Sequence, residues 1–469
     1  MMKFGGTSVG SAERIREVAK LVARYRDRHP AVVTSAMTQI TNQLEDMARL
    51  AVTGNRKRVI ATKLAALKAA HDEAITGLEL EPSAEADLRE IINSKIVILG
   101  NILKSVTALG ELTPRGRDLI LSFGERLSIH LVAAALNNQG VPAVAVNATD
   151  FLLTDDNFND AQPQLLPSKK KAQKLLLPLI EAGTVPVVTG FIGATRDGVT
   201  TTLGRGGSDF SATILGYCLD AEEVWIWTDV DGVMTSDPRT VPDARSIERM
   251  SYEEASELSY FGAKVIHPRT MTPTAELGIP IVIKNTMNPS HPGTQITPAG
   301  DQDTTGAKAV SLMKNLAMIT IQGKGMRGVY GTAARVFDTL AAARVNILFI
   351  SQASSENNIT LVVEKSAGKA ATRALRQTFA TEVRAKRIDF VEYQTGVSLI
   401  AVVGTGMRHH MGMAGHIFSA LGRGGVNVIA IAQGSSELNI TMVVRDTDDA
   451  VALQCIHDEL YGSQKGDHS

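Results

Sequence analysis

Over the first 310 residues, two kinds of segment alternate along the chain. Short runs rich in β-branched residues, such as "AVVTSA", "TVPVVTGFI" and "IPIVIKN", are separated by longer stretches in which apolar residues recur at helical spacing. In the first such stretch Ile15, Val18 and Val22 fall on one helix face, and Ser11 stands where an N-cap is expected. Strands that alternate with helices predict an α/β fold with a mainly parallel sheet.

The pattern changes after the segment "NPSHPGTQITPAGDQDTTGAKAV", whose Pro, Gly, Thr and Asp content predicts a domain boundary. Beyond it the chain repeats itself at a constant offset of 81 residues, so that Gln352 recurs as Gln433 and Asn346 as Asn427. Each copy is typical of a small α+β module. A packing unit alone would explain the repeated apolar positions, whereas the repeated polar residues favour contact with a ligand or partner. We therefore expect domains over residues 1–305, 316–390 and 397–469.

Composition narrows the class of partner. The 48 basic and 49 acidic residues give a net charge of −1, which provides no overall field for nucleic acid or an acidic membrane. Cys218 and Cys455 lie in apolar surroundings without metal-like spacing, as buried thiols do in a reducing compartment. A strand at the start of the chain leaves no room for a signal peptide, and no apolar run reaches about twenty residues. We expect a cytoplasmic protein with neither membrane nor nucleic-acid partners.

Glycine-bearing segments follow several of the predicted strands. In "KFGGTSVGS", Lys3 ends a strand and Gly5 and Gly6 precede a helix, which favours an anion cradle with a lysine charge, although a Gly-Gly turn is also ordinary loop chemistry. In "TTLGRGGSDFSA", Arg205 suits a carboxylate or phosphate ligand, whereas the carboxylate of Asp209 fits neither anion. Either Asp209 caps the next helix or the ligand carries charges of both signs.

Further polar segments stand at other strand and helix ends. "SAMTQITNQL" presents Ser35 and Thr41, "LSFGERLS" sets Glu125 in an apolar helix start, and "FGAKVIHP" offers Lys264. Taken individually, each has an ordinary structural explanation: hydroxyls cap helices, a first-turn glutamate is favoured by the helix dipole, and a lysine is usually solvated. Because parallel strands end at the same edge of a sheet, we expect these groups to meet there.

Taken in order, "KFGGTS", "SAMTQITN", "FGER", "GRGGSD", "WTDVDGVMTSDPR" and "FGAKVIHP" resemble the motifs of the amino-acid kinase family, and within it the aspartate kinases. The carboxyl-terminal repeats resemble that family's paired ACT modules. The resemblance implies a three-layer αβα kinase domain followed by two βαββαβ modules. It also implies transfer of the ATP γ-phosphoryl group to the β-carboxylate of L-aspartate, with Mg²⁺ as cofactor, as the first step of lysine, threonine and methionine biosynthesis.

Site residues follow from residue chemistry and from this resemblance. Arg205 is the natural partner for the α-carboxylate of aspartate and Glu125 for its α-ammonium group, and the resemblance agrees. The resemblance further implies that Lys3, Gly5 and Gly6 cradle the transferred phosphate, with Asp209 orienting the lysine. It adds Ser35, Thr41 and Ser208 near the amino acid, and Thr228, Asp229, Arg239 and Lys264 around ATP. Met234 departs from the family, which often has tyrosine at this position.

Regulation is implied by the ACT resemblance. Its effector contacts would be Met326, Asn346, Ile347, Gln352, Asn427 and Gln433. "ISQASSE" and "IAQGSSE" resemble the threonine-responsive branch more than the lysine-responsive one. The family also implies a homodimer or higher oligomer through the ACT modules, with the second repeat threaded into the first. It often carries homoserine dehydrogenase after the ACT pair, and because the chain stops at Ser469 we expect that activity to be absent.

Two other functions stay open. A non-catalytic amino-acid sensor could retain the kinase fold and use the ACT pair as its output, although the intact charged residues of the motifs argue against it. A kinase for another acidic amino acid, such as glutamate, could use the same folded core.

Overall fold

The computed structural model describes residues 1–53, 57–262, 266–301 and 306–462. The chain divides into two compact units, which are described separately. The first comprises Met1–Val233, Glu248–Tyr252 and Val265–Gly300, and the second comprises Met234–Ile247, Glu253–Lys264 and Asp301–Ser469. The division does not follow the predicted boundary at residue 305, because two short segments of the kinase motifs cluster with the carboxyl-terminal unit.

The first unit is built on an eight-stranded sheet in the order β3-β4-β2-β1-β7-β9-β10-β8. All neighbouring pairs are parallel except β9 and β10, so the predicted mainly parallel sheet is confirmed. The strands are β1 (Met2–Phe4), β2 (Val32–Thr34), β3 (Ala143–Val146), β4 (Val185–Thr189), β7 (Val224–Thr228), β8 (Arg249–Ser251), β9 (Ile281–Asn285) and β10 (Thr294–Thr297). A short antiparallel pair, β5 (Ile192–Ala194) and β6 (Thr200–Thr202), lies outside this sheet.

Two groups of helices pack with the sheet to give the three-layer αβα arrangement. One group includes α1 (Ala12–Arg24) and α6 (Phe123–Asn138), and the other includes α7 (Leu165–Glu181), α8 (Gly207–Cys218) and α10 (Pro268–Leu277). Helix α1 forms as its sequence predicts, because the Ser11 hydroxyl accepts a bond from the Arg14 N–H at 3.3 Å and Ile15 and Val22 are fully buried. Helices α2 (Ile40–Val52) and α5 (Pro114–Leu121) contact one another and α6.

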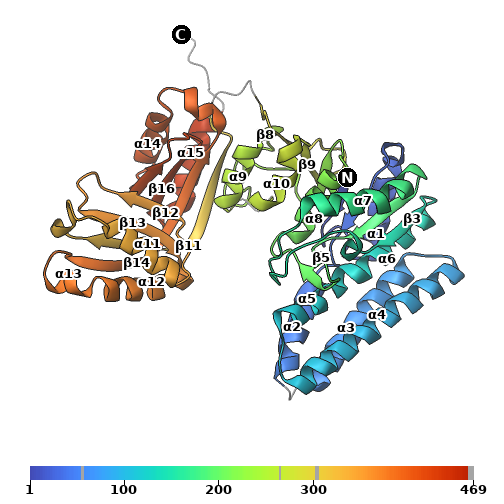
Figure 1. Cartoon of the computed structure of the whole chain (residues 1–469). Helices are drawn as coiled ribbons and strands as arrows, with labels where there is room; N and C mark the ends of the chain where they lie inside the picture. Colours follow the sequence, from blue (N-terminus) through green and yellow to red (C-terminus); the bar gives the residue numbers. More distant parts are fainter. Residues whose placement is uncertain (54–56, 263–265, 302–305, 463–469) are drawn as a thin grey trace, which may run out of the picture. The chain divides into compact units, whose positions relative to one another are not determined.

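Helices α3 (Lys57–Gly77) and α4 (Pro82–Leu109) form a long hairpin (Figure 1). By length and composition, α4 and the stretch Pro114–Asn138 could cross a membrane. This corrects the expectation that no apolar stretch of the chain is long enough to do so. A core helix passes the same test, and most of Pro114–Asn138 is buried. Most of α4 is not buried inside the fold.

The second unit has a six-stranded antiparallel sheet in the order β12-β13-β11-β14-β16-β15. Its strands are β11 (Ala309–Gln322), β12 (Phe349–Gln352), β13 (Asn358–Glu364), β14 (Phe390–Val403), β15 (Ala430–Gln433) and β16 (Asn439–Arg445). Its helices are α11 (Thr332–Ala342), α12 (Lys365–Thr378), α13 (Ala380–Arg384), α14 (Met413–Arg423) and α15 (Asp449–Tyr461).

The two repeats share the long central strands β11 and β14. The start of β11, at Val310, packs in the core of the second repeat with Ile400 and Ile417. The end of β11, at Ile319, packs in the core of the first repeat with Leu361. The start of β11, which precedes the first repeat in sequence, therefore contributes to the second repeat in space.

Candidate functional site

A cleft of about 470 Å³ opens in the first unit, where β1 and β2 end. Side chains from both strand ends and from α6 and α8 line it. The predicted site residues that line the cleft are Lys3, Gly6, Ser35, Thr41, Glu125, Ser208 and Asp209. Residues separated by up to about two hundred positions in sequence thus meet in one cleft, as the sequence predicts.

Lys3 and Asp209 form the central ion pair of the cleft. Lys3 Nζ lies 2.5 Å from Asp209 Oδ1, and both side chains are mostly shielded from solvent. The contact meets the distance of an ion pair but not the angles of a hydrogen bond. The Gly5 backbone lies close by, since a Cβ there would be 3.4 Å from Lys3 Nζ. Asp209 therefore fixes the position of the lysine ammonium group.

Glycines allow the backbone to approach closely around this pair. A Cβ at Gly6 would lie 3.0 Å from the Ala36 carbonyl oxygen, and one at Gly190 would lie 2.8 Å from the Ser208 Cβ. Gly206 begins α8 in the left-handed region, with φ of 70°. The first-turn N–H groups of a helix have no partner within the helix, so the start of α8 offers donors to an anion in the cleft.

Glu125 is an unusual carboxyl group because it is buried in the first turn of α6. One oxygen, Oε1, accepts a bond from the Ala36 N–H at 3.2 Å, while Oε2 has no hydrogen-bond partner in the described part of the chain. Burial raises the pKa of Glu125 to about 8, against the opposing effects of backbone hydrogen bonds and the Lys3 charge. A buried carboxyl group with one oxygen unpaired is suited to a cationic ligand group.

Arg205 lies next to the cleft in sequence, but its side chain is not among those that line it. The residue is exposed, and the described residues provide no hydrogen bond or ion pair for its guanidinium group. The neighbouring Gly204, Gly206 and Gly207 do line the cleft. The predicted role of Arg205 thus stays a prediction.

The residues predicted for the nucleotide are not brought together by the described contacts. Thr228 donates to Asp229 at 3.2 Å at the end of β7. Arg239 belongs to the second unit, where its exposed guanidinium group pairs with Asp237 at 2.6 Å. Lys264 lies outside the described residues. The nucleotide assignment stays a prediction.

Two charged residues that the sequence did not identify, the buried Asp118 and the half-buried Arg269, support segments next to the cleft. Asp118 accepts bonds from the Asn159 N–H, and from the N–H and hydroxyl of Thr202, at 2.7–2.9 Å; desolvation raises its pKa. Arg269 donates to the carbonyl of Ala161 at 2.7 Å and to that of Leu203 at 3.4 Å. Asp118 follows an arginine in "RGRD", but no sequence spacing identifies the loops that these side chains hold.

The effector residues predicted for the second unit fall into two groups. Met326 is buried in the core of the first repeat, while Asn346, Gln352, Asn427 and Gln433 are exposed and Ile347 is half-buried. Ser351 donates to the Ile431 carbonyl at 3.1 Å, which links the two strands that carry the repeated glutamines. The corresponding segments of the two repeats therefore lie side by side.

A helix that follows the kinase motifs contacts both repeats within this unit. Helix α9 (Tyr252–Tyr260) carries Tyr260, whose hydroxyl donates to the Ile347 carbonyl at 3.3 Å. It also carries the buried Glu254, which accepts bonds from the N–H and hydroxyl of Thr405 at 2.8 and 2.7 Å. Thr405 belongs to the segment 404–407 that follows β14, here called the Gly-Met loop of the second repeat. The second unit thus includes part of the sequence that was assigned to the kinase domain.

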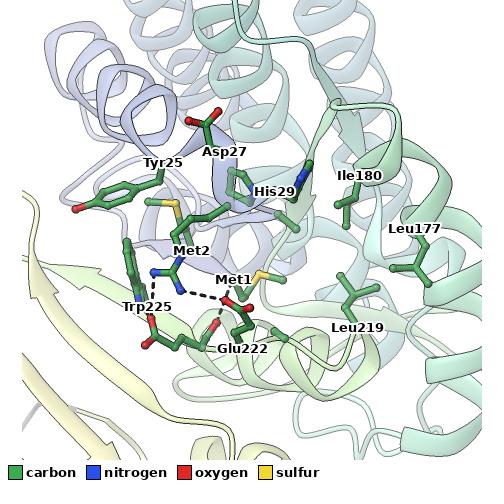
Figure 2. A pocket seen from close by; sticks show the side chains of 15 residues that line it. Met1, Met2, Tyr25, Asp27, His29, Leu177, Ile180, Leu219, Glu222 and Trp225 are labelled. Atoms are coloured by element: carbon green, nitrogen blue, oxygen red, sulfur yellow. Dashed lines mark hydrogen bonds and ion pairs between the residues drawn. The ribbon is translucent and has the colours of Figure 1, made fainter.

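A second hollow, of about 450 Å³, lies at the opposite ends of the strands (Figure 2). It is lined by Met1, Tyr25, Glu222 and Trp225, among others, and by none of the predicted site residues. Its arginine, Arg28, is held by Glu222 at 3.2 Å and stacks on Trp225. These charges are paired with one another, so we assign the site to the first cleft.

Comparison with known proteins decides the family. A model described as "Amino acid kinase family" matches residues 1–285, and a model of the ACT domain matches residues 319–379 and 400–460. The chain belongs to the amino acid kinase family. Within this family, it is 36% identical over 98% of its length to bifunctional aspartokinase/homoserine dehydrogenase 2 of Arabidopsis thaliana, and covers 50% of that relative. It is 34% identical to aspartokinase 2 of the same plant, covering 98% of this chain and 84% of the relative.

The fold resemblance extends over the whole chain. The structure of Escherichia coli aspartokinase III with aspartate and ADP aligns with a TM-score of 0.80 and 29% identity, covering 98% of this chain and 99% of that one. The same enzyme with lysine and aspartate aligns with a TM-score of 0.79, with the same identity and coverage. The chain spans about half the length of the first curated relatives that it matches. The three-layer kinase fold and the paired ACT modules are confirmed.

Proposed function

We propose that this chain is an aspartate kinase, which transfers the γ-phosphoryl group of ATP to the β-carboxylate of L-aspartate. The observation that carries the proposal is the cleft in which the paired ammonium of Lys3 and the half-paired carboxyl of Glu125 lie with the amino end of α8. The aspartokinase relatives, and the E. coli structure with aspartate and ADP, support it.

The cleft suits a ligand that carries both signs of charge. The unpaired oxygen of Glu125 can accept the α-ammonium group, and Ser35, Thr41 and Ser208 offer hydroxyls to the carboxylates. The Lys3 ammonium and the N–H groups at the start of α8 are available to an anion. Arg205, from the exposed edge of the cleft, would take the α-carboxylate.

The reaction needs no general base. A carboxylate oxygen of aspartate, ionised at neutral pH, attacks the γ-phosphorus, and a new O–P bond forms. The bond between the γ-phosphorus and the β,γ-bridging oxygen breaks, and ADP leaves with the electron pair. Two anions must approach each other, so the protein contributes mainly position and positive charge. Lys3 supplies that charge, while Gly5 and Gly6 let the backbone come close.

Magnesium fits this site as a companion of the nucleotide. The described residues include no cluster of three or more histidine, cysteine, aspartate or glutamate side chains that would form a protein metal cage. Mg²⁺ is often held by one or two carboxylates and the substrate phosphates, and Asp209 in the first turn of α8 and Asp229 after β7 are carboxylates that would serve. When bound, the ion offsets charge on the phosphate oxygens. The residues that contact the nucleotide would be Thr228, Asp229, Arg239 and Lys264. We also propose that the enzyme is cytoplasmic.

An amino acid would regulate the activity through the paired ACT modules. The repeated Asn346/Asn427 and Gln352/Gln433 are exposed on linked segments and so are available to an effector. The "SQASSE" and "AQGSSE" segments favour threonine, although E. coli aspartokinase III has been solved with lysine. Lysine inhibition without a threonine effect would reject the threonine assignment. We also propose a homodimer or higher oligomer through these modules.

Trapping the acyl phosphate with hydroxylamine tests the proposal. The full chain is incubated with ATP, Mg²⁺ and, in separate reactions, aspartate, glutamate or acetylglutamate. We expect hydroxamate from aspartate at a rate at least about tenfold above the other two. Product from glutamate alone would identify the other acidic-amino-acid kinase. No product from any acceptor, together with a thermal shift on threonine addition, would favour the non-catalytic sensor.

A further inference from the structure

The turn that follows β1 presents two unpaired backbone N–H groups at the cleft. The Gly5 carbonyl accepts bonds from the N–H groups of Ser8 at 2.9 Å and Val9 at 3.2 Å, so the chain makes one helical turn here. The described residues provide no hydrogen-bond partner for the N–H groups of Gly6 and Thr7, and both residues line the cleft. Successive unpaired N–H groups in a turn form a concave donor site for an anion.

A side chain from outside the turn holds the Gly6 carbonyl. Within the described part of the chain no backbone N–H is bonded to this carbonyl, and the Thr38 hydroxyl donates to it at 2.8 Å. A trans peptide unit points its carbonyl and its N–H in opposite directions. The Gly6 carbonyl and the Thr7 N–H belong to one such unit, so the bond from Thr38 fixes the direction of the Thr7 N–H.

Gly10 provides the space that the Thr38 hydroxyl occupies. A Cβ at Gly10 would lie 2.4 Å from Thr38 Oγ1 and 3.2 Å from the Gly6 carbonyl oxygen. A side chain at Gly10 would therefore push the hydroxyl away from the carbonyl that it holds. The backbone of Gly10 is not in the left-handed region, so this position needs glycine for space and not for conformation.

Buried contacts anchor the surroundings of the Thr38 bond. The buried Ser8 hydroxyl is hydrogen-bonded to the Thr286 hydroxyl at 2.7 Å, which fastens the other end of the turn. The segment that carries Thr38 is itself fixed, because the Ala36 N–H donates to Glu125 Oε1 at 3.2 Å. Thr38 is exposed at the cleft, where a ligand would exclude water from its bond. A hydrogen bond is stronger where water is excluded.

We propose that Thr38 is a positioning residue for phosphoryl transfer, an inference that rests on the proposed function. Its hydroxyl holds the peptide unit between Gly6 and Thr7 so that the Thr7 N–H donates to an oxygen of the transferring phosphoryl group. A donor whose direction is set before the ligand binds acts mainly on the charge that develops in the transition state. Loss of the Thr38 hydroxyl should therefore lower kcat, whereas a hydroxyl that bound aspartate directly would act on KM.

Steady-state kinetics of the full chain test the role of the hydroxyl. Thr38→Val removes it and keeps the side-chain shape, so kcat should fall about five- to tenfold while the KM for aspartate stays within about twofold. Thr38→Ser retains the hydroxyl and should keep kcat within about twofold of wild type. Thr53→Val is the matched control, because the exposed Thr53 hydroxyl also donates to a backbone carbonyl at 2.8 Å but lies outside the cleft. An unchanged kcat for Thr38→Val, or a raised KM for aspartate alone, would overturn the proposal.

A double-mutant cycle tests whether Gly10 acts through the same hydroxyl. Gly10→Ala displaces the hydroxyl and should lower kcat by a factor similar to that of Thr38→Val. In a Thr38→Ala background, Gly10→Ala should cost less than about a further twofold, because the atom closest to the new Cβ is gone. Equal losses from Gly10→Ala in both backgrounds would overturn the proposal. Unchanged melting temperatures would verify that each variant folds.

Amide nuclear magnetic resonance separates this inference from the proposed acceptor. In the full chain labelled with ¹⁵N-threonine, the Thr7 signal is assigned by its loss in Thr7→Ser. The β,γ-imido analogue of ATP, added with Mg²⁺, should shift this amide proton downfield in wild type and Thr38→Ser, and by a smaller amount in Thr38→Val. No shift in wild type, or equal shifts in wild type and Thr38→Val, would overturn the inference. Failure of the proposed function would appear separately, as no hydroxamate from aspartate in wild type.

Discussion

The Lys3 ammonium and the Asp209 carboxylate lie 2.5 Å apart, between the end of β1 and the first turn of α8. The Lys3 side chain is 9% exposed and that of Asp209 is 21% exposed. An ammonium group has three donors, so the aspartate can hold the lysine charge in place while donors remain for an anionic ligand. The pair therefore links the two elements that frame the cleft.

Replacing Lys3 by alanine should reduce kcat far more than it alters the KM for aspartate. The charge that offsets the transferring phosphoryl group is lost, and losses of this kind reduce kcat by about 10²–10³. Steady-state kinetics of Lys3→Ala would measure the effect, with Lys20→Ala as control, because Lys20 is exposed on α1 and pairs with Glu17. A Lys3→Ala variant that retained more than about a tenth of kcat would remove Lys3 from catalysis.

The difference in stability between wild type and Glu125→Gln should change with pH in a defined direction. Burial raises the pKa of Glu125 from 4.5 to about 8, so in this range the folded state holds a proton that the unfolded state has released. This contribution to stability is complete below pH 4.5 and is lost as the pH rises through 8. Glutamine does not titrate, so Glu125→Gln should gain about 4 kcal/mol relative to wild type between pH 5 and 9, from about 1.36 kcal/mol per pH unit over about three units. Chemical denaturation at both pH values measures this, and a constant difference would contradict it.

The same carboxyl group should set the pH dependence of substrate capture. Only the ionised form of Glu125 can pair with the α-ammonium of aspartate, so kcat/KM for aspartate should rise with pH up to about 8. In Glu125→Gln this rise should disappear and the KM for aspartate should increase at least about tenfold. The exposed Glu17→Gln provides the control, and a profile unchanged by Glu125→Gln would place the titrating group elsewhere.

Arg205→Ala distinguishes the substrate side of the cleft from the nucleotide side. Loss of a guanidinium–carboxylate contact should raise the KM for aspartate at least about tenfold and leave the KM for ATP within about twofold. Initial rates with each substrate varied in turn would show the difference. Equal effects on both constants would move Arg205 to the nucleotide.

Glu254→Gln should weaken regulation without changing basal activity greatly. Glu254 accepts two bonds from Thr405, and so connects α9 to the Gly-Met loop of the second repeat. The neutral amide makes weaker bonds there, so the effector concentration for half-inhibition should rise about three- to tenfold. Glu276→Gln, at an exposed position of α10 in the first unit, is the control. Identical inhibition curves for wild type and Glu254→Gln would exclude this contact from the coupling.

The alternation of strands and helices along the chain predicted the parallel sheet. Much of the cleft could be predicted too, because Lys3 and Ser35 lie at strand ends and Asp209 lies at a helix start. Asp118 and Arg269 could not be predicted, since their partners lie about forty to over one hundred residues away in loops without a recognisable pattern. The sharing of β11 between the two repeats is likewise a long-range pairing. In α4, Asn93 and Lys95 interrupt the apolar run. A search for unbroken apolar runs therefore misses this helix, although its mean hydropathy is high.

Nuclear magnetic resonance of the reaction with aspartate labelled with ¹³C at the β-carboxyl carbon tests the central claim most directly. The full chain, ATP and Mg²⁺ should convert the labelled carboxyl into an acyl phosphate that shows coupling between ¹³C and ³¹P, with one ADP formed for each product. Coupling at the α-carboxyl carbon of a separately labelled sample, or ATP hydrolysis to phosphate with no coupled carbon, would contradict it.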